Sequence, residues 1–216
     1  MENIVLNEGS LFEIKIPTST IKENYQLPDP LLLTYYEDKN NRIIWALEKV
    51  EEEAYDWVAQ IIEWNREDRD IPIEERKPIR IIVANSGGSL EAARMVCEIV
   101  KISKTPIYGI AIGVCASAAS MIYLSCHKRF ATKNSYWIFH TGSCSGVGGD
   151  YNQIQAFMED YKEKIQEMIS FYKEFTTYPP EVIEEKMKGS DWYIYPKEAL
   201  NSGVCNKLIE DIDIFL

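Results

Sequence analysis

One stretch decides the fold: residues 107–120 read Ile-Tyr-Gly-Ile-Ala-Ile-Gly-Val-Cys-Ala-Ser-Ala-Ala-Ser. An apolar half leads into small residues, and an apolar helical pattern follows, which predicts a buried strand, a tight turn and a helix that begins at or near Ser117. Free N–H groups and the dipole at a helix N-terminus favour negative charge, which a serine nucleophile needs because its attack on a carbonyl creates an oxyanion. Small residues in such a turn also serve close helix–sheet packing, so the stretch alone leaves the chemistry open.

The composition indicates a globular α/β domain. The chain has 216 residues, of which 46% are hydrophobic and 12% aromatic, enough for one full core. Its formal net charge of −11 argues against nucleic acid and anionic membranes as partners. No apolar run is long enough to span a membrane, and the first residues have neither the basic nor the apolar region of a signal peptide, so we expect neither feature.

The cysteines favour a reducing compartment. They stand at positions 97, 115, 126, 144 and 205, odd in number and mostly within apolar segments, which suits free thiols in a cytoplasm. Cys126-His127 is half of what a metal site needs, but no second pair follows at ligand spacing. The sequence therefore predicts no metal and no other cofactor.

Strand and helix patterns alternate after an irregular start. Residues 1–35 carry three prolines between short apolar pieces, which predicts an N-terminal arm or cap before a domain at 36–216. Apolar runs predict strands at 43–47, 79–83, 107–112 and 136–139; helical spacing predicts helices at 50–64 and 89–102, from 117, at about 150–175 and after Pro179-Pro180, before a last helix–strand pair, with a solvated loop at 65–70. This alternation favours a mostly parallel sheet with crossover helices.

A serine nucleophile needs a base, and the chain has two histidines. His127 lies in a polar segment that reads as a helix end, where a capping role is favoured. His140 ends the apolar strand at 136–139, and the ends of parallel strands are where α/β folds assemble their sites. His140 is therefore the candidate base, with a partly buried strand-end histidine as the alternative.

A Gly-Gly turn upstream supplies candidate oxyanion donors. Gly87-Gly88 follows the strand pattern at 79–83 and precedes a helix start at Ser89. Glycine lets the backbone approach a substrate closely and turn an N–H toward it. Plain turn chemistry and a phosphate cradle are the alternatives, but the cradle lacks the P-loop lysine and the third glycine of a dinucleotide fingerprint.

Four motifs in one order carry a family resemblance. Residues 38–210 resemble the Clp protease proteolytic-subunit family, serine peptidases that stack as rings under an ATP-driven unfoldase. The matching segments are Gly87-Gly88-Ser89 for the family's glycine turn, Gly113-Val114-Cys115-Ala116-Ser117 for its Gly-x-x-Ala-Ser nucleophile motif, Asn134 to His140 for its histidine segment, and Asp191 to Ala199 with Gly203 for its last signature. The four together are far more specific than any one of them.

The resemblance implies a role for each matched residue. Ser117 is implied to be the nucleophile, and His140 the general base and then the general acid. Asp191 would hold the imidazole tautomer and stabilise the imidazolium, although it also suits a cap of the next segment. The backbone N–H groups of Gly88 and Ala118 would form the oxyanion hole.

The resemblance also implies a fold and partners. The fold is an α/β ClpP/crotonase-like spiral of strand–turn–helix units, with a strand–helix handle protruding at about 141–175. Peptides or unfolded proteins would be the substrates; further copies of the chain, in a heptameric or double ring, and an AAA+ unfoldase would be the partners. An apolar stripe along 150–175 fits burial in such an oligomer, with packing inside one subunit as the alternative for about half of it.

The chain departs from the family pattern in its N-terminal arm, which is longer than usual, and at three of the motifs. Ser86 stands where a proline usually precedes the Gly-Gly, Thr141-Gly142 replaces Gln-Pro after the histidine, and Ser190 and Trp192 flank the aspartate where a basic residue is usual. These departures concern the turn, the handle and ring stacking, and leave the triad intact. Two alternative functions stay open: a crotonase-like acyl-CoA enzyme and a non-catalytic ring subunit.

Overall fold

The computed structural model describes residues 3–4, 14–15, 30–144, 146–189 and 191–215, and the chain divides into two units, Met1–Glu37 and Asp38–Leu216. In the first unit, β1 (Asn3–Ile4) pairs antiparallel with β2 (Ile14–Lys15), and α1 (Pro30–Asn41) begins. Most of the arm predicted at 1–35 lies outside the described residues. Pro30, which we predicted to be irregular, opens a helix, because the missing N–H of a proline breaks no helical hydrogen bond at the first position.

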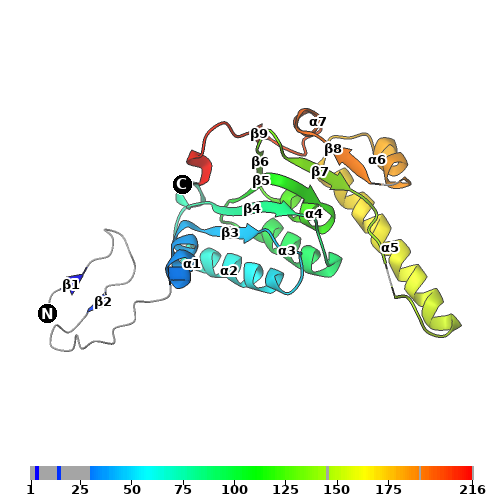
Figure 1. The fold of residues 1–216 in the computed structure, drawn as a ribbon, viewed down its shortest axis with the longest axis horizontal. Coiled ribbons are helices and arrows are strands. Elements are labelled where there is room, and N and C mark those ends of the chain that lie inside the picture. The colour runs from blue at the N-terminus through cyan, green and yellow to red at the C-terminus, as the bar shows by residue number, and fades with distance from the viewer. Residues whose placement is uncertain (1–2, 5–13, 16–29, 145, 190, 216) are drawn as a thin grey trace. The chain divides into compact units, whose positions relative to one another are not determined.

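The strands of the second unit form one sheet around β5 (Figure 1). β3 (Ile43–Ala46), β4 (Ile79–Asn85), β5 (Ile107–Ala116), β6 (Lys128–Ala131) and β9 (Lys207–Leu208) lie in that order, and every neighbouring pair is parallel. β7 (Tyr136–Phe139) pairs in parallel with the C-terminal part of β5, and β8 (Trp192–Ile194) pairs antiparallel with β7. β4 is apolar along most of its length and mostly buried, which is typical of a central parallel strand.

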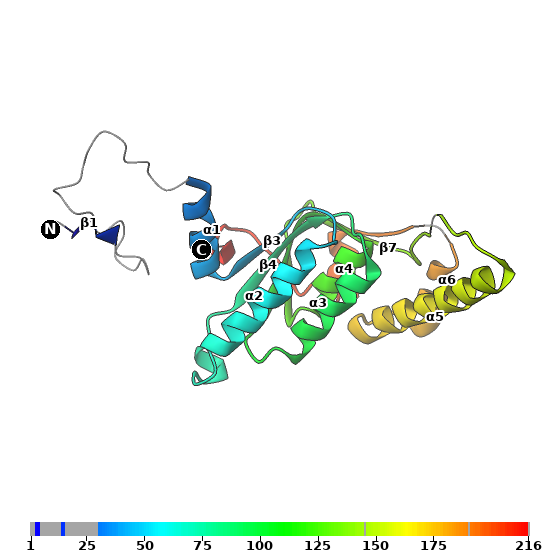
Figure 2. The same cartoon turned by 90° about the horizontal axis from the view of Figure 1, so that it is seen from below.

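Three crossover helices cover one face of this sheet. α2 (Glu53–Glu67), α3 (Leu90–Ile102) and α4 (Ser117–Ser125) lie side by side, as Figure 2 shows. Ser89 begins α3 as its N-cap, since its Oγ accepts a hydrogen bond from the Ala92 N–H at 3.2 Å. The predicted α/β architecture of strand–turn–helix units is confirmed.

A long helix, α5 (Tyr151–Phe175), projects from the sheet (Figure 1). Asp150 and Gln153 form a capping box at its start. Its C-terminal half packs against the core, where four side chains are buried: Met168, Ile169, Phe171 and Tyr172. Its N-terminal half exposes Tyr151, Ile154 and Met158. The predicted apolar stripe is therefore buried within the chain along one half and exposed along the other.

The strand that we predicted before this helix is not formed. Residues 141–144 and 146–149 belong to no strand. Gly142, Gly146 and Gly149 have φ values of 79°, 72° and 137°, which a β-strand excludes. The handle of this chain is therefore a helix alone within the described residues.

Among the described residues, the remaining elements lie toward the C-terminus, apart from a short 3-10 helix at Ile73–Glu75. They are α6 (Pro180–Met187), α7 (Pro196–Asn201) and a 3-10 helix at Asp213–Phe215. In the part of the chain that the structure describes, no helix is both long enough and apolar enough to cross a membrane.

Three local predictions were wrong. Of the segment 126–129, predicted as a helix end, Cys126 is the C-cap of α4, but Lys128 and Arg129 already belong to β6; β8 was not predicted at all. His127 does not cap α4, because its Nδ1 accepts the Ile107 N–H at 2.9 Å, and burial lowers the pKa of His127. α2 extends to Glu67 through half of the predicted loop, where Asn65 gains a tertiary partner by donating from Nδ2 to Ser103 Oγ at 2.8 Å.

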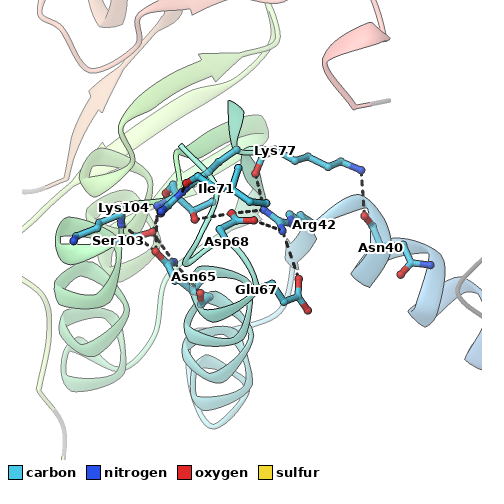
Figure 3. A network of polar contacts seen from close by, with 12 residues as sticks. Asn40, Arg42, Asn65, Glu67, Asp68, Ile71, Lys77, Ser103 and Lys104 are labelled. Atoms are coloured by element: carbon cyan, nitrogen blue, oxygen red, sulfur yellow. Dashed lines mark hydrogen bonds and ion pairs between the residues drawn. The ribbon is translucent and has the colours of Figure 1, made fainter. Parts of the chain in front are cut away.

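A buried ion pair joins segments that are distant in sequence (Figure 3). Arg42 has a left-handed backbone with φ 56° just before β3. Its guanidinium donates to both carboxylate oxygens of Asp68, at 2.6 and 2.7 Å, and Asp68 is only 1% exposed. Thr105 donates from Oγ1 to the same carboxylate at 2.8 Å. The end of α2 is thereby fixed to the starts of β3 and β5.

Asp68→Asn is expected to destabilise the fold by about 3 kcal/mol, because it leaves the buried guanidinium without its counter-charge. Burial raises the pKa of Asp68, but the hydrogen bonds from Arg42 and Thr105 and the charge of Arg42 outweigh burial and lower the pKa overall. A carboxyl group whose pKa is lower in the folded than in the unfolded chain stabilises the fold at pH values above its unfolded pKa of about 4. This stabilisation is lost as the pH falls toward the folded pKa.

Urea unfolding at several pH values measures both effects. The advantage of wild type over Asp68→Asn should be constant above about pH 5 and shrink below about pH 4. Glu67→Gln is the control, since Glu67 contacts the same guanidinium at 3.4 Å but is 51% exposed, and it should cost less than about 1 kcal/mol. An advantage that grows on acidification would contradict the assignment.

Candidate active site

Strand register brings three of the predicted site residues to one edge of the sheet. Ala116, the last residue of β5, pairs with Ile138 of β7, and Phe139 of β7 pairs with Trp192 of β8. Ser117 follows β5, His140 follows β7 and Asp191 precedes β8. Three adjacent strand ends therefore carry the serine, the histidine and the aspartate.

His140 and Asp191 face each other across the ends of β7 and β8. His140 Nδ1 lies 3.5 Å from Asp191 Oδ1, with the two side chains 27% and 49% exposed. This distance exceeds the roughly 2.7–3.2 Å of a formed hydrogen bond. His140 Nε2 is buried and has no hydrogen-bond partner among the described residues. Asp191 precedes a strand, so the alternative of a helix cap is wrong for it.

Ser117 stands on a strained turn at the start of α4. Its φ of 54° is left-handed, which is uncommon for a residue with a Cβ. Helix N-termini leave their first N–H groups without acceptors inside the helix, and Ala118 is the second residue of α4. The Ala118 N–H is therefore available at the position where the sequence predicted an oxyanion donor.

The Gly-Gly turn lies directly against the serine. A Cβ at Gly87, whose φ is 101°, would lie 2.6 Å from Ser117 Cβ. Gly88 is bridged to Val50: the Val50 N–H donates to the Gly87 carbonyl at 3.1 Å, and the Ser89 N–H donates to the Val50 carbonyl at 2.7 Å. This bridge uses groups of the two residues beside Gly88, and the Gly88 N–H itself has no hydrogen-bond partner among the described residues.

Sequence reasoning missed the residue that shapes this turn. Asn85 is 1% exposed, and its Oδ1 accepts the Gly87 N–H at 2.7 Å while its Nδ2 donates to the Glu48 carbonyl. An asparagine at a strand end before two glycines is a signal for such a turn, because its side chain bonds to backbone two residues on.

A pocket of about 280 Å³ opens beside the serine. Residues 141–144 line it together with α3 and α5, and Ser117 and Ala118 form part of its wall. Lys164 stands in the wall between two carboxylates, 2.7 Å from Glu91 and 3.0 Å from Asp160.

The other histidine is excluded as a base by its place in the fold. His127 bonds to Ile107, the first residue of β5, whereas Ser117 follows the last. The ten residues of β5 separate them by about 30 Å at the rise of a strand. The structure therefore brings His140 and Asp191 together on adjacent strand ends with Ser117, although no hydrogen bond joins His140 Nε2 to the serine.

Comparison with known proteins points to one family. A family model described as Clp protease matches residues 33–211. Among curated proteins, the chain is 29% identical over 140 residues to ATP-dependent Clp protease proteolytic subunit 2 of Treponema denticola, spanning 62% of this chain and 68% of that protein. It is 24% identical over 188 residues to the protein of the same name from Bifidobacterium longum, spanning 86% of each.

A solved structure shares the fold. A mutant of ClpP1 from Listeria monocytogenes matches with a TM-score of 0.71 and 22% identity, over 85% of this chain and 99% of that one. The likeness confirms the predicted ClpP-like α/β fold class.

Proposed function

The chain belongs to the Clp protease family, and from this premise we propose that it is a serine endopeptidase with a Ser117–His140–Asp191 triad. One observation carries the proposal: the register of β5, β7 and β8 puts these three side chains on adjacent strand ends. A serine, a histidine and an aspartate rarely fall on three adjacent strand ends by chance. Each of the three residues also lies in the corresponding motif of the family, and the motifs follow the family's order.

In the proposed mechanism, His140 carries a proton between Ser117 and the leaving group. Ser117 Oγ attacks the peptide carbonyl carbon, and its proton passes to His140 Nε2, which has no other partner among the described residues. The C–N bond then breaks, and the leaving amine takes that proton from His140. Water, deprotonated by His140 in turn, attacks the acyl carbon; the bond from that carbon to Ser117 Oγ breaks, and Oγ takes back the proton from His140. Asp191 accepts the Nδ1–H of His140 and stabilises the imidazolium.

The backbone N–H groups of Gly88 and Ala118 are proposed to bind the oxyanion. Their support is geometric: the first lies in the turn that contacts Ser117, and the second is in the first turn of α4. Each such donor is worth about 3 kcal/mol of transition-state stabilisation. The contact between His140 and Asp191 is long, and such contacts in free enzymes commonly tighten when substrate binds.

We further propose that the chain acts in a homo-oligomeric ring on peptides or unfolded proteins. The exposed apolar half of α5, with Tyr151, Ile154 and Met158, supports burial against further copies. An AAA+ unfoldase that uses ATP, a heptameric or double ring and a cytoplasmic location stay predictions from the family resemblance and the cysteines.

A second candidate, a non-catalytic ring subunit, is favoured by one observation. His140 Nε2 has no hydrogen bond to Ser117 among the described residues, so the proposed nucleophile and base are not engaged. The acyl-CoA alternative has no comparable support, since the matching family model is that of Clp proteases.

Fluorophosphonate labelling with peptide hydrolysis and light scattering on the same sample tests these proposals. Wild type is expected to form an oligomer, to cleave peptides and to take the label at Ser117, as located by mass spectrometry. Ser117→Ala should assemble without labelling or cleavage. An oligomer that takes no label would support the non-catalytic subunit; a monomer that cleaves peptides would contradict the ring and leave the peptidase standing.

A further inference from the structure

A buried asparagine lies under the turn that carries a proposed oxyanion donor. Asn85 ends β4, and both groups of its side-chain amide are bonded to backbone. Its Oδ1 accepts the Gly87 N–H at 2.7 Å, and its Nδ2 donates to the Glu48 carbonyl. Glu48 lies between β3 and α2, so this one amide ties that segment to the glycine turn.

The pairing of β4 with β5 is irregular at this asparagine. Val83 pairs with Ala111, but Asn85 pairs with Cys115, so a step of two residues (83 to 85) in β4 faces a step of four (111 to 115) in β5. An irregularity of this kind bends a strand and redirects the residues that follow it. Ser117 comes two residues after Cys115, so Asn85 lies beside the strand of the proposed nucleophile as well as under the turn.

The bonds to Gly87 determine the direction of the Gly88 N–H. A peptide unit is planar and trans, so the Gly88 N–H points away from the Gly87 carbonyl of the same unit. The Val50 N–H donates to that carbonyl at 3.1 Å, while Asn85 holds the N–H of the unit before it. Glycine at φ 101° has no Cβ to restrict its rotation, and these two bonds restrict it instead.

The segment after β3 supports the turn from its other side. Val50 is fully buried and forms a parallel bridge with Gly88. A Cβ at Gly88 would collide with the Val50 carbonyl oxygen, so the two backbones are in close contact. Because Asn85 also bonds to Glu48, it helps to place Val50 against the turn.

We infer that Asn85 is a positioning residue for the proposed oxyanion hole, acting through Gly87 on the direction of the Gly88 N–H. Gly88 itself is exposed, so its N–H is open to a substrate. A donor that already points in one direction needs no reorganisation when the oxyanion forms. The inference rests on the proposed peptidase function and adds to it a residue that sequence reasoning did not assign.

Two substitutions at position 85 separate positioning from stability. Asn85→Ala removes both bonds and should lower kcat about 10- to 100-fold at a nearly unchanged KM, somewhat less than the roughly 10²- to 10³-fold of a donor lost outright. Asn85→Ser leaves a similar void, but a serine hydroxyl can still accept from the N–H two residues on, more weakly. Its kcat should be about threefold to tenfold below wild type, at the same lowered melting temperature as Asn85→Ala.

Asn65→Ala is the matched control. Asn65 also bonds to backbone on two sides: its Oδ1 accepts the N–H groups of Lys104 and Thr105, at 3.0 and 3.1 Å, and its Nδ2 donates to the Ile61 carbonyl at 2.9 Å (Figure 3). Both N–H groups precede β5, at the end of that strand away from the proposed nucleophile. The change should lower the melting temperature at least as much as Asn85→Ala and leave kcat unaltered.

Three results would overturn the inference alone: wild-type kcat in Asn85→Ala, equal kcat losses in Asn85→Ala and Asn65→Ala, or an Asn85→Ser variant no more active than Asn85→Ala. Should Asn85→Ala not fold, Asn85→Ser decides: a lowered kcat at unchanged KM supports the inference, and a wild-type kcat overturns it. A wild-type chain that takes no fluorophosphonate label would overturn the peptidase proposal and this inference with it.

Discussion

Asp191→Asn should lower kcat for peptide hydrolysis by about 10³- to 10⁴-fold, with little change in KM. The carboxylate lies 3.5 Å from His140 Nδ1, on the side of the ring away from Nε2. An asparagine amide turns an N–H toward Nδ1, which favours the tautomer with its proton on Nε2. That tautomer cannot accept the proton of Ser117, so the base is lost although the shape of the site is kept.

Asp70→Asn is the control for this change. Asp70 is exposed and follows α2, so the same loss of one negative charge should leave kcat unaltered. Circular dichroism and light scattering should show the same fold and assembly for both variants. Full activity in Asp191→Asn would remove the aspartate from the triad and leave Ser117 and His140 as a dyad.

Gly87→Ala is expected to lower kcat/KM at least about 100-fold, because a displacement of the nucleophile of about 1 Å has effects of that size. The new Cβ would lie 2.6 Å from Ser117 Cβ and 2.9 Å from the Ala116 carbonyl oxygen. The backbone of Gly87, at φ 101°, is also one that alanine avoids. Something must move, and the nearest atoms belong to the nucleophile and its own strand.

The control for this change is Gly148→Ala. Gly148 lies in the stretch before α5, where an added Cβ meets no heavy atom within 4 Å. It should keep wild-type kcat/KM and a wild-type rate of fluorophosphonate labelling. If Gly87→Ala labels at the wild-type rate, the contact between the turn and Ser117 does not govern reactivity.

The parts of the fold that sequence could predict are those set by a continuous pattern. Residues 107–120 predicted β5, the turn and the start of α4, because an apolar run followed by small residues has few other solutions. The apolar run at 136–139 also predicted that His140 would follow a strand, at the end where parallel strands assemble their sites. The pairing of β8 brings Asp191 to the same edge of the sheet. β8 could not be predicted, because a strand of three residues is too short to show an apolar pattern of its own.

The contacts that sequence could not predict join residues far apart in the chain. Arg42 and Asp68 are charged residues within polar surroundings, and nothing local says that the carboxylate is buried. Tyr172 looked like one member of an apolar stripe, and only the packing of α5 brings its ring onto Phe139, with centroids 4.2 Å apart. The strand that was expected after His140 is not formed in the described residues 141–144 and 146–149, since a strand forms only where the fold supplies a partner.

Residues 141–144 beside the serine belong to no strand, and under the proposed peptidase function this affects how substrates would be selected. An extended peptide that pairs with residues 141–144 fixes their backbone as well as its own, at an entropic cost of about 1–2 kcal/mol per residue. Binding would then release heat, and much of that enthalpy would be cancelled by ordering. Short peptides make too few inter-strand backbone hydrogen bonds to offset this cost. Discrimination would therefore follow the length of extended chain a substrate offers, more than the identity of any single side chain.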